Sequence, residues 1–322
     1  MLFGNRGFLQ ISALILCCGC HLARPRKVIS AIPRDTSEAY FVCEHAGLAQ
    51  AASPYGLSIY WNGPSGNDDS EQQIVYAKRA IEKNDMGIVL TPSAPYAMDT
   101  VIQQAILHDI PVVILGAAIP LPPNPRLSFV LNDGKRAGLL VAQHIRESVG
   151  ERGEVVIAGL DPMSSESTDI VTSFEAELAR IAPQIRIVGR IVGPSTFGQS
   201  EMEMEMALEM HPHIGAIYAL DTNSTRGAVA ALQHMKSTAK PRIVGYNQAT
   251  DLLFLLRQGI IDSLIIQDMR AMGRQAVENI VASRGGHSVT PITYREPVLL
   301  TRGNIDTEAM QDLLLMDWRS TP

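Results

Sequence analysis

The fold is decided by residues 241–267, PRIVGYNQATDLLFLLRQGIIDSLIIQ, in which two apolar runs enclose a stretch with the pattern of a helix. The runs 241–246 and 261–266 are short and rich in β-branched residues, as buried strands are. This unit predicts a strand, a helix and a second strand. The same alternation continues along the chain in both directions, which predicts a parallel α/β protein.

The alternation falls into two similar halves, so we expect two doubly wound parallel-sheet lobes. The strands expected in the first half are residues 28–32, 57–61, 86–91, 111–115 and 127–131, and those in the second half are 154–159, 185–192, 214–220, 241–246 and 261–266. Helices are expected over 38–53, 70–83 and 268–283, and a final strand over 297–301.

Two local features help to locate the ends of these elements. Ser70 and Gln73 have the spacing of a capping box, which predicts the start of the helix over 70–83. Four prolines in residues 117–125 exclude a helix or a central strand there. We interpret this segment as the first crossing between the lobes or as a loop beside it.

Composition excludes several classes of protein. The 322 residues suffice for about two domains at the usual size, and a hydrophobic content of 46% can fill two cores. The 27 Lys and Arg residues against 33 Asp and Glu residues give a net charge of −6. Nucleic acid is therefore not an expected partner, because proteins that bind it normally carry a basic surplus.

The N-terminus has the pattern of an export signal. Arg6 precedes an apolar run, residues 7–19, that is too short to span a bilayer. Residues 1–19 resemble a bacterial lipoprotein signal, in which Cys20 becomes the lipidated first residue, and residues 20–27 would then form a polar tether. A plainly cleaved signal and an uncleaved anchor remain alternatives.

The body of the chain shows no catalytic or cofactor motif. GxGxxG, Walker, HExxH and GxSxG patterns are all missing from the sequence. Cys43 is the one thiol left after the signal and the lipidated residue, so no disulfide framework is possible, and its apolar surroundings predict a buried, unreactive group. We expect no catalytic residue, no cofactor and no metal.

One cluster offers a metal-binding alternative. Met202, Met206 and Met210 share a helix face just before the histidines of 211–213, which would suit copper. We favour a structural interpretation, in which the methionines pack against the sheet and Pro212 ends the helix.

Several motifs in order resemble the type I periplasmic binding proteins, specifically the ribose-binding-like group that serves ABC importers. The resemblance covers nearly all of residues 28–306. It rests on the aromatic segment 37–41, the pair Asp133 and Gly138, the His-Pro turn at 211–212 before the strand 214–218, the segment 244–247 (Val-Gly-Tyr-Asn), the strand end 265–267 and the C-terminal segment 297–306.

The resemblance implies two lobes joined by three crossings, with the ligand between them. The N-terminal lobe would contain 28–131 and 268–290, and the C-terminal lobe 132–267 and 291–322. Carried over position by position, the resemblance implies a ligand site of aromatic and polar side chains: Arg34, Glu38, Tyr40, Phe41, Thr91, Asp221, Asn247 and Gln267.

The chain also departs from the family pattern. Gly116 and Ala117 stand where the family has Asp-Arg, and Thr168 or Ile170 stands where it has an Arg. Our hypothesis is that Arg34 replaces one of the lost charges and that Asp169 or Asp221 compensates elsewhere. Polar groups over an aromatic platform suit a neutral polyhydroxy ligand, because each buried hydroxyl needs a partner.

The leading hypothesis is an exported, lipid-anchored solute-binding receptor that captures a sugar or polyol and delivers it to an ABC importer. We expect a monomer at the periplasmic or extracytoplasmic face of a bacterial membrane, whose partners are the ligand and an ABC permease or membrane receptor, and which contacts the membrane only through its lipid.

Three alternatives remain. The first is an exported sensor that docks on a membrane kinase or chemoreceptor. The second is a ligand-sensing domain related to lactose-repressor-like regulators, although those carry a helix-turn-helix where this chain has an export signal. The third is an enzyme that uses a carboxylate pair from Glu38, Asp221 or Asp251, for which the spacing gives no support.

Overall fold

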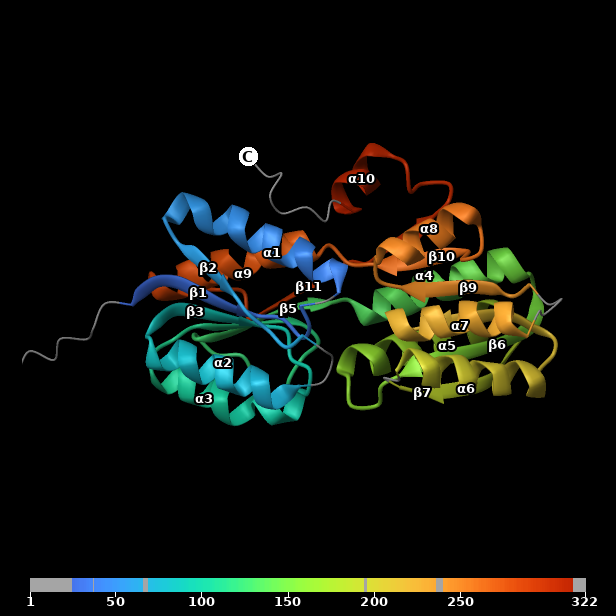
Figure 1. Ribbon diagram of the computed structural model, residues 1–322, viewed down its shortest axis with the longest axis horizontal. Coiled ribbons are helices and arrows are strands. Elements are labelled where there is room, and N and C mark those ends of the chain that lie inside the picture. Colours follow the sequence, from blue (N-terminus) through green and yellow to red (C-terminus); the bar gives the residue numbers. More distant parts are fainter. Residues whose placement is uncertain (1–24, 37, 66–68, 194–195, 236–239, 315–322) are drawn as a thin grey trace, which may run out of the picture.

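The computed structural model describes residues 25–314, apart from positions 37, 66–68, 194–195 and 236–239. They form two α/β lobes, each with a six-stranded sheet and helices on both faces (Figure 1). The fold class expected from the sequence is confirmed.

The N-terminal lobe has the strand order β11-β5-β4-β3-β1-β2, and all of its pairings are parallel. Its strands are β1 (Arg26–Ile32), β2 (Ser58–Trp61), β3 (Asp85–Leu90), β4 (Val112–Gly116), β5 (Leu127–Asn132) and β11 (Ile292–Arg295). Helices α1 (Ala39–Ala52) and α9 (Met269–Arg284) cover one face, and α2 (Ser70–Glu82) and α3 (Asp99–Leu107) cover the other (Figure 1). Two short 3-10 turns, η1 (Ser53–Tyr55) and η2 (Pro95–Met98), follow α1 and precede α3.

The C-terminal lobe repeats this plan with the order β12-β10-β9-β8-β6-β7, in which only β12 is antiparallel to its neighbour. Its strands are β6 (Arg152–Leu160), β7 (Gln184–Val192), β8 (Ile214–Ala219), β9 (Arg242–Tyr246), β10 (Ser263–Ile266) and β12 (Val298–Thr301). Its two apolar cores contain, on one face, α4 (Gly134–Val149) and α5 (Ser165–Ile181), and on the other α6 (Phe197–Met210), α7 (Thr222–His234), α8 (Thr250–Gln258) and α10 (Glu308–Leu314).

Three segments cross between the lobes. The chain passes from β5 to α4 at residues 132–134, from β10 to α9 at 267–268, and from β11 to β12 at 296–297. The expected boundary at residue 291 is wrong, because β11 pairs with β5 in the N-terminal lobe. The sequence Ile-Thr-Tyr-Arg alternates exposed and half-buried side chains at a sheet edge, so it lacks the apolar run that marks the other strands.

Two further expectations are corrected by the structure, and one pair of alternatives is decided. Strand β1 begins at Arg26, within the predicted tether, where Arg26 Nη1 lies 3.0 Å from Asp85 Oδ1. Residues 117–125 connect β4 to β5 inside one lobe, so of the two alternatives they form the loop and not the crossing. Asp69, not Ser70, caps α2 by accepting from the Gln72 amide.

The methionines of α6 do not form a buried stripe. Met202, Met206 and Met210 are 55%, 48% and 70% exposed. The helix instead buries the face that contains Met204 and Leu208, because these positions lie over the sheet core. The expectation that the other three methionines pack against the sheet is therefore wrong.

The predictions for residues 1–19, for Cys20 and for most of the tether lie outside the described residues. Within the described part of the chain, no helix is both long and apolar enough to cross a bilayer. Cys43 is 1% exposed, and burial raises the pKa of its thiol, which confirms the expectation of a buried group.

Candidate functional site

A cleft of about 520 Å³ between the lobes forms the candidate site. Its lining comes from segments at the carboxyl ends of strands in both lobes, where open parallel sheets generally bind ligands. Thr91 follows β3 and Gly116 ends β4 in the N-terminal lobe, while Asp221 and Asn247 follow β8 and β9 in the C-terminal lobe.

The structure brings together in this cleft all eight side chains expected from the sequence: Arg34, Glu38, Tyr40, Phe41, Thr91, Asp221, Asn247 and Gln267. Their part in binding stays a prediction. Gly116 and Ala117 also line the cleft and contribute no charge where the resemblance has Asp-Arg. Of the two positions considered for the second missing arginine, Ile170 lies in the lining.

The aromatic part of the N-terminal wall consists of Tyr40 and Phe41. Their ring centroids are 4.3 Å apart, with 34° between the planes. Phe41 is 1% exposed and packs in the core of the lobe, whereas Tyr40 is only half-buried. Tyr40 is therefore the more accessible of the two rings in the cleft wall, and Phe41 packs against it.

An ion pair joins the lobes beside this wall. Glu38 precedes α1, and its Oε1 lies 3.5 Å from Nη1 of Arg226 in α7. Arg226 is held in place by Asp251, whose carboxylate accepts from its Nε and Nη2 at 2.8 and 3.0 Å. Burial raises the pKa of Glu38, and the charge of Arg226 offsets part of that rise.

A hydrogen-bond network forms the wall next to the crossings. Glu166, in the first turn of α5, accepts at Oε1 from the Tyr246 hydroxyl at 2.8 Å and from Asn132 Nδ2 at 2.9 Å. Gln267 Nε2 donates to the same Tyr246 hydroxyl at 2.9 Å. Burial raises the pKa of Glu166. The hydrogen bonds from Tyr246 and Asn132 and the charge of Arg34 make this rise smaller. The network joins two of the crossings, at Asn132 and Gln267, to the C-terminal lobe.

Asp221, in the cleft lining, is the N-cap residue of α7. It caps α7, accepting at Oδ1 from the Ser224 amide and at Oδ2 from the Ser224 hydroxyl, at 2.9 and 2.6 Å. Burial raises the pKa of Asp221. Gly159 at the end of β6 makes room for this cap, because a Cβ there would lie 2.1 Å from Asp221 Oδ2 and the residue has a φ of +81°.

Asn247 adopts a left-handed conformation with a φ of +68°, which asparagine tolerates better than most residues. Its Nδ2 donates to Thr222 Oγ1 at 3.3 Å. The segment after β9 is thereby fixed at the edge of the cleft.

A second buried carboxyl lies behind the N-terminal wall. Glu44 in α1 is 0% exposed, and Thr91 donates to its Oε2 at 3.2 Å. Burial raises the pKa of Glu44 to about 8. Thr91, which lines the cleft, is therefore hydrogen-bonded to a titratable carboxyl that lies outside the lining.

Sequence reasoning missed Asn132, Asp161, Glu166 and Tyr246, all of which line the cleft. A usable signal was present for all four. Asn132, Asp161 and Tyr246 stand at or directly after the carboxyl ends of strands, and Glu166 stands in the first turn of the helix after β6. With these residues, four carboxylates and one guanidinium line the described part of the cleft: Glu38, Asp161, Glu166, Asp221 and Arg34.

The family model of the periplasmic binding protein domain matches residues 29–287. The chain belongs to this family. Two curated relatives of this periplasmic binding protein are the ribose import binding protein of Bacillus subtilis strain 168, 21% identical over 241 residues, and the D-allose-binding periplasmic protein of Escherichia coli K12, 20% identical over 267 residues. The matches cover 74% of this chain and 75% of the first relative, and 80% of this chain and 85% of the second.

Solved structures show the same fold. An ABC transporter solute-binding protein from Agrobacterium vitis, bound with α-D-tagatopyranose, is 18% identical with a TM-score of 0.81, and a carbohydrate transporter solute-binding protein from Agrobacterium radiobacter, in complex with D-arabinose, is 21% identical with a TM-score of 0.80. Each match covers 89% of this chain and 98% of the other.

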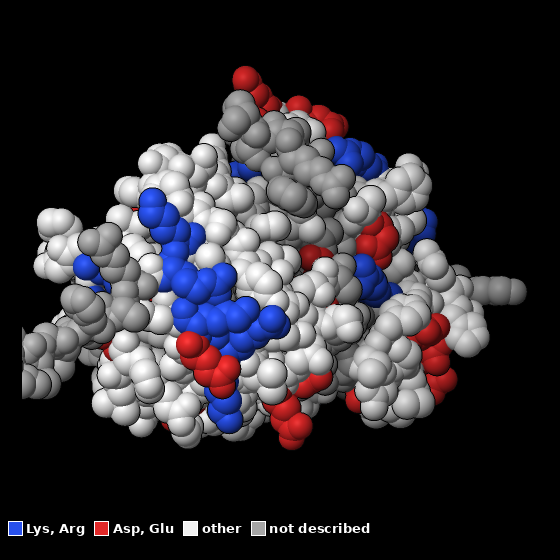
Figure 2. Space-filling model, turned by 60° about the vertical axis from the view of Figure 1, so that its left-hand side comes forward, with Lys and Arg blue, Asp and Glu red and all other residues white. Residues whose placement is uncertain are grey.

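Outside the cleft the charge is distributed differently. Figure 2 shows lysine and arginine side chains gathered in a band on the side of the N-terminal lobe that faces the viewer. Arg34 is the one Lys or Arg in the described lining of the cleft, so this band lies outside it. The binding protein therefore combines a basic surface band with an acidic cleft.

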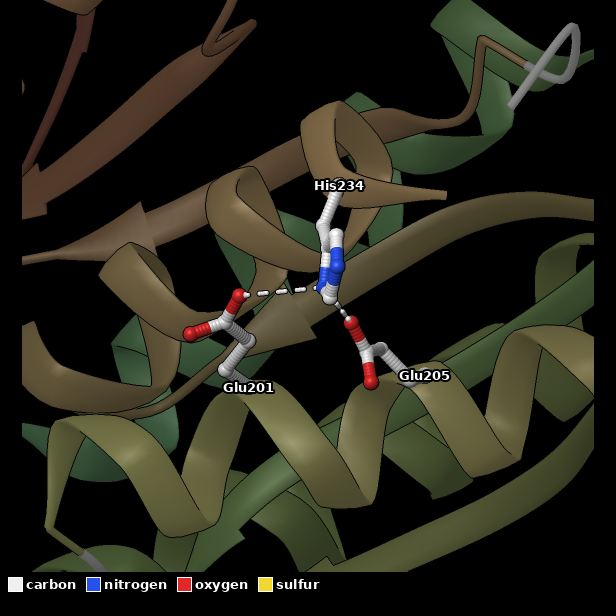
Figure 3. Close-up of side chains that lie close together, drawn as sticks. All are labelled: Glu201, Glu205 and His234. Carbon is white, nitrogen blue, oxygen red and sulfur yellow. Dashed lines mark hydrogen bonds and ion pairs between the residues drawn. The ribbon is translucent and has the colours of Figure 1, made fainter. Parts of the chain in front are cut away.

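One group of three potential metal ligands occurs in the described residues, on the surface of the C-terminal lobe. Glu201 and Glu205 of α6 flank His234 of α7 (Figure 3), with His234 Nδ1 3.8 Å from Glu201 Oε1 and 2.6 Å from Glu205 Oε1. The His234 side chain is 73% exposed. These contacts suffice to explain the cluster as a tie between two packed helices.

Proposed function

We propose that this protein is an exported receptor that captures a sugar or polyol in the interlobe cleft and delivers it to an ABC importer. Membership of the periplasmic binding protein family supports a binding role outside the cytoplasmic membrane. The names of the curated relatives, a ribose import binding protein and a D-allose-binding protein, support a monosaccharide as the cargo.

The observation that carries the proposal is the composition of the cleft wall. Tyr40 supplies an aromatic face, which suits the C–H groups of a sugar ring. Amide and carboxyl groups, such as Asn132, Glu166 and Gln267, supply hydrogen-bond partners for hydroxyls. A volume of about 520 Å³ is of the size that small-molecule sites have.

Both lobes contribute to this wall, so a bound ligand stabilises the closed arrangement. Tyr40 and Thr91 belong to one lobe, and Glu166 and Asn247 belong to the other. A ligand that touches both gains more contacts when the lobes are together, and this difference in affinity drives closure. An importer that recognises the closed form can then distinguish loaded from empty receptor.

The proposal includes the membrane attachment. Residues 1–19 serve as the export signal, Cys20 carries the lipid, and the receptor works as a monomer on the outer side of the cytoplasmic membrane. The polar residues after Cys20 hold the two lobes away from the lipid surface.

Thermal unfolding against a panel of pentoses, hexoses, deoxysugars, polyols and nucleosides tests the proposal, with a chain that lacks residues 1–19 and carries Cys20→Ser. A ligand at ~1,000 times its dissociation constant adds about 4 kcal/mol, which raises the melting temperature by roughly 8 °C or more. A shift confined to one class of sugar or polyol is expected. An unchanged melting temperature with every compound of the panel would contradict the proposal.

A further inference from the structure

The wall next to the crossings leaves two amide oxygens without partners. Tyr246 donates its hydroxyl proton to Glu166, so its oxygen accepts from Gln267 Nε2, and Gln267 Oε1 is turned away from the network. Asn132 Nδ2 also donates to Glu166, which turns Asn132 Oδ1 away. Among the described residues neither oxygen has a hydrogen-bond partner, although Gln267 is 2% exposed.

Buried polar atoms are nearly always hydrogen-bonded in proteins, so these two acceptors call for donors from a ligand. Asn132, Glu166 and Gln267 belong to one continuous network, with successive contacts of 2.9, 2.8 and 2.9 Å. All three line the cleft. The wall therefore presents a carboxylate together with two amide oxygens that have no donor among the described residues.

The charge of the cleft also favours a ligand that donates hydrogen bonds and carries a positive charge. Four carboxylates and one guanidinium belong to the described lining, and Arg226, outside the lining, is shared between Glu38 and Asp251. Buried carboxylates without a cation are costly, because they lose the solvation that water gives them. Burial raises the pKa of Glu166 and of Asp221, which is the response of such groups when no sufficient positive charge is near.

We propose that the cleft is built for a monosaccharide or polyol that carries a primary ammonium group, and that this group binds at Asn132, Glu166 and Gln267. An ammonium supplies three donors and no acceptor, together with a positive charge. A hydroxyl supplies one donor and no net charge, so it offers these acceptors less than an ammonium does. This inference rests on the proposed function, since Tyr40 and the other polar groups hold the rest of the sugar.

The test is a calorimetric titration with matched ligands, at about pH 6.5, below the usual pKa of an amine flanked by electron-withdrawing groups. The probes are D-glucosamine, D-galactosamine and D-mannosamine, each against its 2-hydroxy parent and its N-acetyl derivative. Charge-assisted hydrogen bonds are worth about twice neutral ones. We expect at least one amino sugar to bind ten-fold or more tighter than both of its neutral counterparts.

Glu166→Gln removes the charge and retains the shape, and it is expected to reduce the preference for the amine to less than three-fold. Glu175→Gln in the same helix is the matched control, because Glu175 pairs with Arg190 outside the cleft lining and its loss should leave the preference unchanged. If the Glu166 variant does not fold, the comparison of ligands on the native chain decides the question alone.

The outcomes separate this inference from the proposed function. If a parent sugar binds as tightly as its amino form or more tightly, the ammonium site is wrong and the sugar receptor stands. If neither form of any monosaccharide in the wider panel binds, both are wrong. An amine preference that survives in the Glu166 variant would place the ammonium elsewhere and overturn the assignment.

Discussion

Glu38 and Arg226 form an ion pair between the two lobes, with 3.5 Å between Oε1 and Nη1. One residue precedes the first helix of the N-terminal lobe, and the other lies in α7 of the C-terminal lobe. The pair exists only when the lobes are together. It therefore stabilises the closed arrangement directly, independently of any ligand.

Replacement of Arg226 by Gln is expected to weaken ligand binding two- to five-fold. Exposed ion pairs are worth about 0.2–1 kcal/mol, and Arg226 is partly exposed. The dissociation rate should rise, because the closed form loses a contact. Arg190→Gln is the control, since Arg190 pairs with Glu175 inside the C-terminal lobe and its loss should leave affinity unchanged. An Arg226 variant with native affinity and dissociation rate would show that the pair does not contribute to closure.

Glu44 makes stability depend on pH. Its pKa of about 8 in the folded chain lies above its ordinary value of 4.5, so between these values the folded state binds more protons than the unfolded state. The contribution to stability is fully present below pH 4.5 and is lost as the pH rises through 8. Glu44→Gln should remove this loss. The melting temperature of the variant minus that of the native chain should therefore be larger at pH 9 than at pH 5.

The control for Glu44 is Glu147→Gln, which changes an exposed carboxyl in α4. Its melting temperature should follow that of the native chain at every pH. If the difference between Glu44→Gln and the native chain were the same at pH 5 and pH 9, Glu44 would not titrate in this range.

Gly159→Ala is expected to destabilise the chain and to disturb the cleft. The new Cβ would meet Asp221 Oδ2 at 2.1 Å and Ser224 Oγ at 2.5 Å, which breaks the cap of α7. Gly56→Ala is the matched control, because Gly56 also has a positive φ, of +62°, but has nothing within 4 Å of its Cβ position. In Gly56→Ala the free energy of unfolding should fall only by the cost of backbone strain, about 1 kcal/mol, and the affinity for ligand should be unchanged.

Chemical unfolding and titration of both glycine variants measure this difference. The expected loss at Gly159 exceeds that at Gly56 by about 1–3 kcal/mol, the usual cost of leaving a buried polar group unsatisfied. Equal losses in the two variants would mean that the Asp221 cap adjusts freely.

The membrane anchor is tested in cells of a bacterial host. Cys20→Ser should abolish incorporation of labelled fatty acid and move the protein from the membrane to the soluble fraction. Cys43→Ala, which changes a buried thiol, should leave both properties unchanged. Fatty-acid incorporation that persists in the Cys20 variant contradicts the assignment.

Much of the site was predictable because parallel α/β sheets collect strand ends at one edge. Thr91, Asp221 and Gln267 each follow an apolar run that can be recognised without a structure. Their place in one cleft then follows from the topology. Asn132 and Glu166 stand at a strand end and a helix start, which places them near the cleft, but only the three-dimensional structure shows that their side chains join one network in its wall.

The local errors have physical causes as well. Strand β11 is short and half exposed, so its residues do not form an apolar run. Met202 and Met206 share a helix face, but the spacing cannot say which face the helix buries, and Met204 occupies the buried one. Gln73 was expected at a helix cap, whereas it is fully buried and its Nε2 bridges the carbonyls of Pro33 and Thr91 at 2.9 Å each.

The central claim is that the interlobe cleft binds a sugar or polyol. Its most direct test is a calorimetric titration of the panel's strongest ligand into the native chain, into Asn247→Ala and Gln267→Ala, and into Glu147→Gln as the surface control. We predict saturable binding at one site per chain, ten-fold or weaker affinity in both cleft variants, and native affinity in the control. Native affinity in both cleft variants would contradict the account.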